Sequence, residues 1–159
     1  MGVNDESILI EMNCSCHGNV LPIIRNFIRS VAREMGFCEE ETAKIEISVD
    51  EASSNILCHA YKDELKQESS ERSFKIRILV RTSQDHLQVS ISDYGIGNKD
   101  GEHMGVQNIE EFMKEGYGLG TYIIHKFMDK VEVLYPRDAG TTVSMVKFLQ
   151  TQKQNSYDI

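Results

Sequence analysis

The sequence predicts an α+β fold: a two-layer sandwich in which helices cover one face of a mixed, mostly antiparallel sheet. Two observations predict this class. Helical periodicity is concentrated between residues 20 and 61, and alternating apolar and polar residues are concentrated between residues 74 and 149. A length of 159 residues fits one domain with one core. We place this domain at residues 1–149 and a polar C-terminal tail at residues 150–159.

The N-terminal part predicts a strand and a helix. Residues 7–12 are rich in β-forming side chains and are expected to open the sheet. A helix begins at about Val20, where Pro22 is tolerated in the first turn, and Gly36 is expected to cap its C-terminus. Its apolar positions recur at spacings of three and four: Val20, Ile23, Ile24, Phe27, Ile28 and Val31.

A second helix is predicted from about residue 39 to Tyr61. It begins with three glutamates, at positions 39–41, which suit the positive end of a helix dipole. Residues 63–73 are polar enough to form a loop after it. The expected buried stripe of this helix consists of Ile45, Val49, Ala52, Ile56 and Ala60.

The second half of the chain predicts two strand pairs with a helix between them. Residues 74–82 and 87–92 alternate in hydrophobicity and form a hairpin that ends at Asp93. Residues 98–115 are rich in glycine and charge, with a short helical stretch at 106–113, and are predicted to be a mobile lid. The expected later elements are a helix at 119–128, with Tyr122, Ile123, Phe127 and Met128 facing inward, and strands at 130–135 and 141–149.

Composition excludes several classes of function. A formal net charge of −8 argues against a protein that binds nucleic acid directly, because phosphate neutralisation needs a clustered basic surface. No apolar run approaches the roughly 20 residues that span a bilayer, and no signal peptide is recognisable, so we expect a cytoplasmic protein without membrane contact. The cysteines, which are expected to be free thiols and not zinc ligands, are Cys14, Cys16, Cys38 and Cys58.

Glu51 and Asn55 form the first candidate site. They lie four residues apart on the second predicted helix and therefore project from the same face, one turn apart. The amide oxygen of an Asn is a suitable hard ligand for Mg²⁺, and a neighbouring Glu can orient or deprotonate a nucleophile. The same spacing also occurs in helices whose Glu and Asn are merely solvated.

Two glycine motifs follow. Asp93 ends a strand, and Gly95 and Gly97 after it let the backbone turn sharply and approach a ligand. In residues 116–120, Gly-Tyr-Gly-Leu-Gly, three glycines lead into a helix whose N-terminal N–H groups favour phosphate. Taken alone, the first motif also fits an ordinary hairpin exit, and the second also fits a flexible hinge.

The order and spacing of these motifs resemble a known superfamily. Residues 51–61, with the form Asp-Glu-Ala-x-x-Asn followed by His-Ala-Tyr, resemble the N box of the GHKL ATPases, which include gyrase, Hsp90, histidine kinases and MutL. Residues 93–97 are similar to the G1 box, residues 116–120 to the G2 box, and residues 140–141 to the last adenine-side motif. The resemblance covers roughly residues 39–148 and implies the Bergerat ATP-binding fold. Within the superfamily, the compact length most resembles the bacterial anti-sigma-factor serine kinases.

The resemblance implies ATP and Mg²⁺ as cofactors and a role for each matched residue. Asn55 would hold Mg²⁺, Glu51 would act as the general base, and Asp93 would read adenine. Thr141 would assist at the adenine. The residues implied in the lid and the phosphate cradle are Gly95, Gly97, Gly116, Gly118, Leu119 and Gly120.

The resemblance also implies partners. Kinases of this group phosphorylate a serine of a STAS-type antagonist protein, otherwise bind an alternative sigma factor, and are usually homodimers. Two alternatives stay open at this point. One is an ATP-gated switch that binds a partner other than a sigma factor without kinase chemistry, and the other is a protein that binds no nucleotide.

Overall fold

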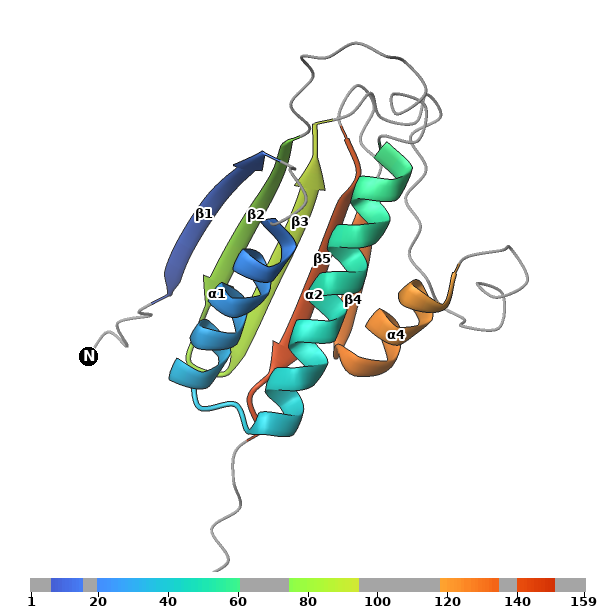
Figure 1. Cartoon of the computed structure of the whole chain (residues 1–159). Helices are drawn as coiled ribbons and strands as arrows, with labels where there is room; N and C mark the ends of the chain where they lie inside the picture. Colours follow the sequence, from blue (N-terminus) through green and yellow to red (C-terminus); the bar gives the residue numbers. More distant parts are fainter. Residues whose placement is uncertain (1–6, 16–19, 61–74, 95–117, 135–139, 151–159) are drawn as a thin grey trace, which may run out of the picture.

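The computed structural model describes residues 7–15, 20–60, 75–94, 118–134 and 140–150 (Figure 1). None of the helices in these ranges has the length and apolar character needed to cross a membrane. Along the chain, the described elements are β1 (Ile8–Ser15), α1 (Val20–Glu34), α2 (Glu39–Ala60), β2 (Lys75–Thr82), β3 (His86–Asp93), α4 (Leu119–Phe127), β4 (Lys130–Leu134) and β5 (Thr142–Phe148).

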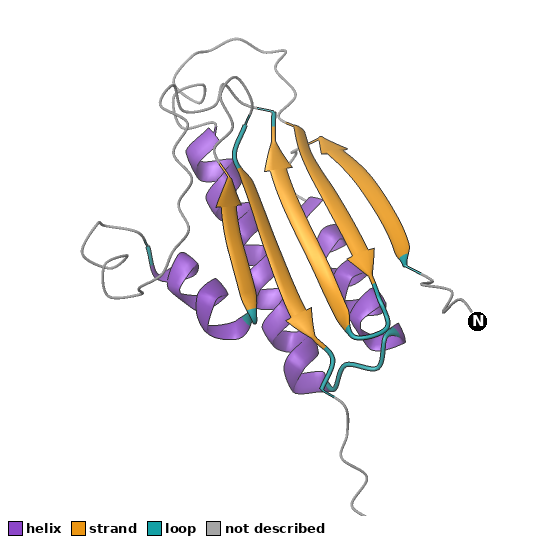
Figure 2. Ribbon diagram, turned by 180° about the vertical axis from the view of Figure 1, so that it is seen from behind, coloured by secondary structure: helices purple, strands orange, loops and turns teal. Residues whose placement is uncertain are grey.

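The strands form one five-stranded sheet in the order β1-β2-β3-β5-β4 (Figure 2). Each neighbouring pair is antiparallel, so the parallel component of the expected mixed sheet does not occur among the described strands. In the pairing of β3 with β5, Ser92 lies opposite Thr142. This register brings the end of β3 next to the start of β5.

All three described helices lie on the same face of the sheet, as expected for a two-layer α+β sandwich (Figures 1 and 2). Alternate strand residues point toward the helices, because successive side chains of a strand face opposite sides. Full burial of one such aliphatic side chain contributes roughly 1.5–3 kcal/mol. The fully buried strand residues of this core include Ile76, Ile78, Val80, Leu87, Val89, Ile91 and Met145.

Helix α1 ends as predicted, at a glycine cap. Gly36 adopts a φ of 93°, in the left-handed region that favours glycine. The Gly36 N–H donates to the Arg33 carbonyl at 2.9 Å, and the Phe37 N–H donates to the Ala32 carbonyl at 3.1 Å. These two bonds form a Schellman motif, and Phe37 and Ala32 are both buried in the core.

Ion pairs join one flank of α1 to α2. Three arginines spaced four residues apart reach three acids of α2, which fixes the antiparallel register of the two helices. Exposed ion pairs add little to stability by themselves, and the Arg33–Glu39 pair is of this kind. The pairs, each 2.8 Å between nitrogen and oxygen, are Arg25–Asp50, Arg29–Glu46 and Arg33–Glu39.

Several predictions of burial need correction or lie outside the described residues. On α1, Ile24 and Ile28 are buried as predicted, but Ile23 is 66% exposed. On α4, the buried residue is Ile124, which the predicted inward set omitted, while Tyr122, Ile123 and Phe127 are only partly buried. Met128, just after the helix, is buried as predicted. The predicted loop at 63–73, lid at 98–115 and most of the tail at 150–159 lie outside the described residues.

Candidate nucleotide site

Glu51 and Asn55 lie on the flank of α2 that faces α4. Both are partly exposed, whereas Ala52 and Ile56 next to them are buried. The pair therefore lies where the core ends, on one helix face, as the sequence predicted. Its carboxylate and amide can reach a ligand while the backbone of α2 stays anchored in the core.

The first turn of α4 packs directly against this pair. A Cβ atom added to Gly120 would overlap Oε2 of Glu51, and would lie 3.2 Å from Glu51 Cδ and 3.5 Å from Asn55 Nδ2. Gly118 is the N-cap of α4 and makes no side-chain capping hydrogen bond. Gly118 therefore cannot cap the first N–H groups of α4 through a side chain, and the first turn of α4 begins beside Glu51 and Asn55.

Asp93, Gly140 and Thr141 form a second cluster, at the edge where β3 ends and β5 begins. Asp93 is 7% exposed, and its N–H donates to the Thr141 carbonyl at 3.1 Å. In return, the Thr141 N–H donates to Asp93 Oδ2 at 2.9 Å. A Cβ on Gly140 would overlap Oδ1 of Asp93 and would lie 2.6 Å from its carbonyl carbon. These contacts fix the direction of the Asp93 carboxylate.

The structure thus forms two clusters of predicted site residues from four parts of the chain. Figure 1 shows that the C-terminal half of α2, the end of β3 and the start of β5 lie at the same end of the molecule, with α4 beside α2. Gly118, Leu119 and Gly120 open α4, as predicted. The remaining predicted site residues, Gly95, Gly97 and Gly116, lie outside the described residues.

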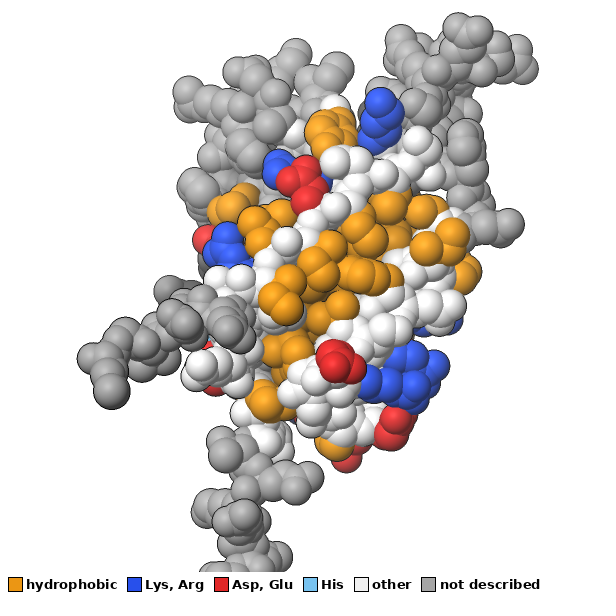
Figure 3. Space-filling view, turned by 90° about the vertical axis from the view of Figure 1, so that its left-hand side faces the viewer, with side chains coloured by type: hydrophobic (Ala, Val, Ile, Leu, Met, Phe, Trp, Pro, Cys, Tyr) orange, Lys and Arg blue, Asp and Glu red, His pale blue; other side chains and the backbone are white. Residues whose placement is uncertain are grey.

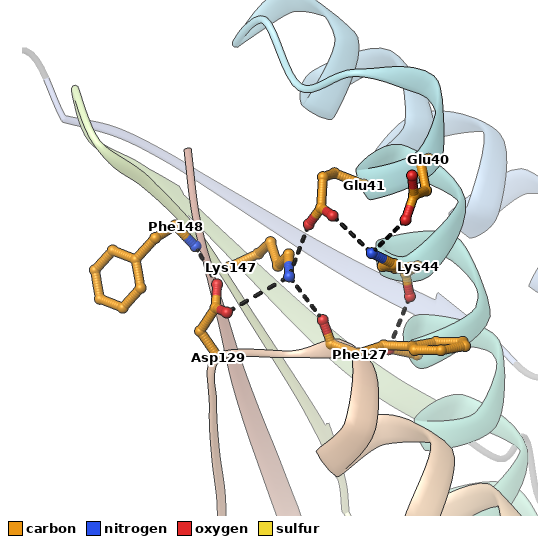
Figure 4. A network of polar contacts seen from close by, with 8 residues as sticks. Glu40, Glu41, Lys44, Phe127, Asp129, Lys147 and Phe148 are labelled. Atoms are coloured by element: carbon orange, nitrogen blue, oxygen red, sulfur yellow. Dashed lines mark hydrogen bonds and ion pairs between the residues drawn. The ribbon is translucent and has the colours of Figure 1, made fainter. Parts of the chain in front are cut away.

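A buried cation at the other end of α4 was missed by the sequence analysis. Lys147 of β5 is 6% exposed, and its ammonium lies 2.7 Å from Oε2 of Glu41 and 2.9 Å from the Phe127 carbonyl (Figure 4). The signal was present in the sequence. Val143, Met145 and Lys147 are spaced by two, so the alternation of β5 places this lysine on the buried face.

The carboxylate of Glu41 is the centre of this cluster. Burial raises its pKa, but hydrogen bonds from Lys147 and Lys44 outweigh that effect, so the net pKa lies below its usual value. The Lys44 ammonium also lies 2.8 Å from Oε1 of Glu40, and the hydrogen bonds that it donates to Glu40 and Glu41 raise the pKa of this lysine. Glu41 therefore stays ionised and holds two cations near the start of α2.

Comparisons with known proteins agree with this fold. Residues 18–147 match the family described as histidine kinase-like ATPase domain. A serine-protein kinase RsbW of Bacillus pumilus is 32% identical, with 95% of this chain and 92% of the relative covered. A serine-protein kinase RsbW of Bacillus cereus is 30% identical, with 91% and 87% covered.

A solved structure, the SiaB–SiaC complex of Pseudomonas aeruginosa, contains a chain of the same fold. The TM-score is 0.59 at 14% identity, and the match covers 88% of this chain and 89% of that one. The match over residues 18–147 and the two RsbW relatives identify the family independently of that structure. The chain belongs to the histidine kinase-like ATPase family and, within it, to the group of the RsbW serine-protein kinases.

Proposed function

We propose that this chain uses Mg-ATP to phosphorylate a serine of a STAS-type antagonist protein, and that it binds an alternative sigma factor otherwise. The observation that carries the proposal is the contact of Gly120 with Glu51 and Asn55. It brings a carboxylate, an amide and the N-terminus of a helix to one place. The names of the RsbW relatives support the serine kinase activity.

The proposed adenine end of the site is the cluster around Asp93. Its carboxylate would accept a hydrogen bond from the adenine amino group, with Thr141 assisting. The hydrogen bond from the Thr141 N–H to Asp93 Oδ2 supports this role, because it holds the carboxylate in one orientation before the ligand arrives. Gly95 and Gly97 would let the backbone approach the base.

The proposed phosphate end is the start of α4. The N–H groups of its first turn and the positive end of its dipole favour an anion there. Gly118, Leu119 and Gly120 would line the phosphates, together with Gly116. The N-cap residue, Gly118, has no side chain that could cap these N–H groups, which supports this role.

The residues present fit a magnesium ion held jointly by protein and nucleotide. Mg²⁺ prefers oxygen ligands and usually combines one or two protein groups with waters and phosphates. Among the described residues, no cluster of three or more His, Cys, Asp or Glu side chains forms a metal cage, but the Asn55 amide supplies a suitable oxygen. When bound there with ATP, Mg²⁺ would neutralise charge on the phosphates.

Glu51 would act as the general base. It would accept the proton of the substrate serine as the serine oxygen attacks the terminal phosphorus of ATP, and ADP would leave. Because Gly120 has no side chain, the Glu51 carboxylate can lie against the first turn of α4, beside the proposed phosphates. Nucleophile, base and leaving group would then meet at one point.

The proposed assembly is a homodimer that exchanges protein partners. The structure solved as a SiaB–SiaC complex is an assembly of two different proteins, which supports a protein partner for this fold without naming one here. A pull-down with and without ATP, followed by mass spectrometry, would identify the partner of this chain.

Phosphorylation with radiolabelled ATP tests the proposal. Wild-type protein should transfer label to a serine of the antagonist, and Glu51→Gln should reduce the rate by about 100-fold or more, because a general base typically contributes that factor. Glu132→Gln is the matched control, since Glu132 is an exposed residue of β4. A Glu51→Gln protein as fast as wild type would show that Glu51 is not the base.

Calorimetry with Mg-ATP and ADP separates the alternatives. Nucleotide binding without any phosphoserine would favour an ATP-gated switch without kinase chemistry. If saturating nucleotide gave neither heat nor thermal stabilisation, the ATP site itself would be wrong, because any ligand that binds only the folded state must stabilise it.

A further inference from the structure

Helix α4 is short, and both of its ends contact other elements. It has nine residues and is therefore about 13 Å long. At its N-terminus, Gly120 lies against Glu51 and Asn55 of α2. At its C-terminus, the carbonyl of its last residue, Phe127, accepts a hydrogen bond from Lys147 at 2.9 Å. Because this helix is short, we expect a shift of its C-terminus to displace its N-terminus as well.

Lys147 joins three elements at the C-terminal end of α4, as Figure 4 shows. It belongs to β5, it pairs with Glu41 of α2 at 2.7 Å, and it donates to the last carbonyl of α4. Its ammonium also lies 3.5 Å from Asp129, in the turn that follows α4. A buried ammonium needs such partners, because an unpaired one would be costly to remove from water.

The turn after α4 is itself fixed to β5. The Asp129 N–H donates to the Val146 carbonyl at 2.9 Å, and the Phe148 N–H donates to Asp129 Oδ2 at 2.7 Å. With Lys147 between them, these bonds leave the C-terminus of α4 little freedom to slide. Lys147 also satisfies a helix-end carbonyl, that of Phe127, and its positive charge lies at the negative end of the helix dipole.

The charge of Lys147 is better explained by a role in positioning the C-terminus of α4 than by a contribution to stability. Buried ion pairs can often be replaced by apolar residues of similar size without loss of stability, so their presence is weak support for a stabilising role. A directional donor is different, because only a donor at this point can hold the Phe127 carbonyl. On α2, Glu41 holds this end of α4 through Lys147, and Glu51 and Asn55 lie against the other end.

We propose that Lys147 is a positioning residue of the nucleotide site. It holds the C-terminus of α4 so that the first turn of this helix stays against Glu51 and Asn55. The inference rests on the proposed function, since it assigns the phosphates of Mg-ATP to that first turn. Lys147 itself does not touch the nucleotide.

The test compares Lys147→Met with wild type by calorimetry with Mg-ATP, well below the unfolding temperature. We expect the dissociation constant to rise about tenfold or more at an unchanged binding stoichiometry, because small misplacements of binding groups have effects of this size. A merely structural role would instead lower the stoichiometry, as part of the protein unfolds, and leave the dissociation constant unchanged. That result would overturn the inference.

Two further variants serve as controls for the calorimetry. Lys130→Met is the matched control, because Lys130 is an exposed lysine at the start of β4 outside the Glu41–Lys147 pair. Glu41→Met/Lys147→Met removes both charges, so no buried carboxylate loses a partner if the single variant folds poorly. The double variant should show the same weakened binding of Mg-ATP.

Hydrogen exchange without nucleotide tests the position of α4 directly. In Lys147→Met, the amides of residues 121–128 should exchange at least about tenfold faster, while those of β2 and β3 stay protected. Unchanged protection of α4 would overturn the inference. If wild-type protein bound no Mg-ATP, the proposed function would fail, and the exchange rates alone would decide whether Lys147 holds α4.

Discussion

At the scale of single residues, positions 120 and 140 require glycine, because a Cβ atom at either position would overlap a neighbouring residue. The Cβ of a residue at position 120 would meet the far end of the Glu51 side chain, which can rotate away. The Cβ of a residue at position 140 would also meet the backbone of Asp93, which cannot. The same substitution should therefore affect function at the first position and stability at the second.

Gly120→Ala should mainly reduce phosphoryl transfer. The new methyl group displaces the Glu51 carboxylate from the first turn of α4, and we expect the rate to fall by about tenfold or more, or roughly 1.4 kcal/mol in the activation free energy. The unfolding temperature should change little, because alanine is the better helix former. Gly118→Ala is the matched comparison: no atom of the described residues lies within 4 Å of its Cβ, so its effect should be smaller. Equal losses would contradict the prediction.

Gly140→Ala should mainly reduce stability. Its Cβ would lie 2.6 Å from the Asp93 carbonyl carbon, so the ends of β3 and β5 must separate or distort. Overpacking of this kind typically costs about 1–3 kcal/mol. Urea unfolding followed by circular dichroism would measure the loss. A midpoint equal to that of wild type would show that this strand end adjusts freely.

At the scale of elements, the cap of α1 makes a prediction of its own. Gly36→Ala should lower the free energy of unfolding by roughly 1–2 kcal/mol, because a Cβ is unfavourable at a φ of 93°. In the part of the chain that the structure describes, no atom lies within 4 Å of the added Cβ, so the cost comes from the backbone conformation. Gly36→Asn should cost less, because Asn tolerates the left-handed region. Denaturant unfolding of both variants checks the order.

Helices and strands long enough to repeat their apolar pattern several times could be predicted from the sequence. Short elements could be predicted only in part. The alternation of β2 and β3 and the glycine after α1 were sufficient to predict the hairpin and the cap. Helix α4 has nine residues, with apolar side chains at Tyr122, Ile123, Ile124 and Phe127. These point in several directions, so the sequence alone does not select one face. Packing against α2 and β4 selects it and buries Ile124.

At the scale of the whole molecule, the candidate site depends on contacts between distant segments. The spacing of Glu51 and Asn55 predicted their common face, because that is a local property of a helix. The contact of Gly120 with both residues, and that of Gly140 with Asp93, are set by how α4 and β5 pack. Family resemblance predicted that these motifs converge, but it did not predict which atoms touch.

At this scale, two ionisable groups of the described residues, His125 and Glu41, predict a loss of stability in acid in two stages. Burial lowers the pKa of His125 below its usual value of about 6.5. The unfolded chain then binds a proton that the folded chain resists, so stability should fall as the pH drops through about 6.5. Glu41 also has a lowered pKa, and the stability that its ionised form provides should fall as the pH drops below about 4.5.

Urea unfolding at a series of pH values separates the two stages. His125→Gln should flatten the dependence between about pH 7 and about pH 5, because the titrating group is removed, and should leave the loss below about pH 4.5 in place. Glu41→Gln should lower the free energy of unfolding at neutral pH, because Lys147 and Lys44 lose an ionised partner. The same variant should lose less further stability than wild type below about pH 4.5. If His125→Gln kept the slope of wild type between those pH values, another group would have to bind the proton, and the burial of His125 would have no part in the first stage.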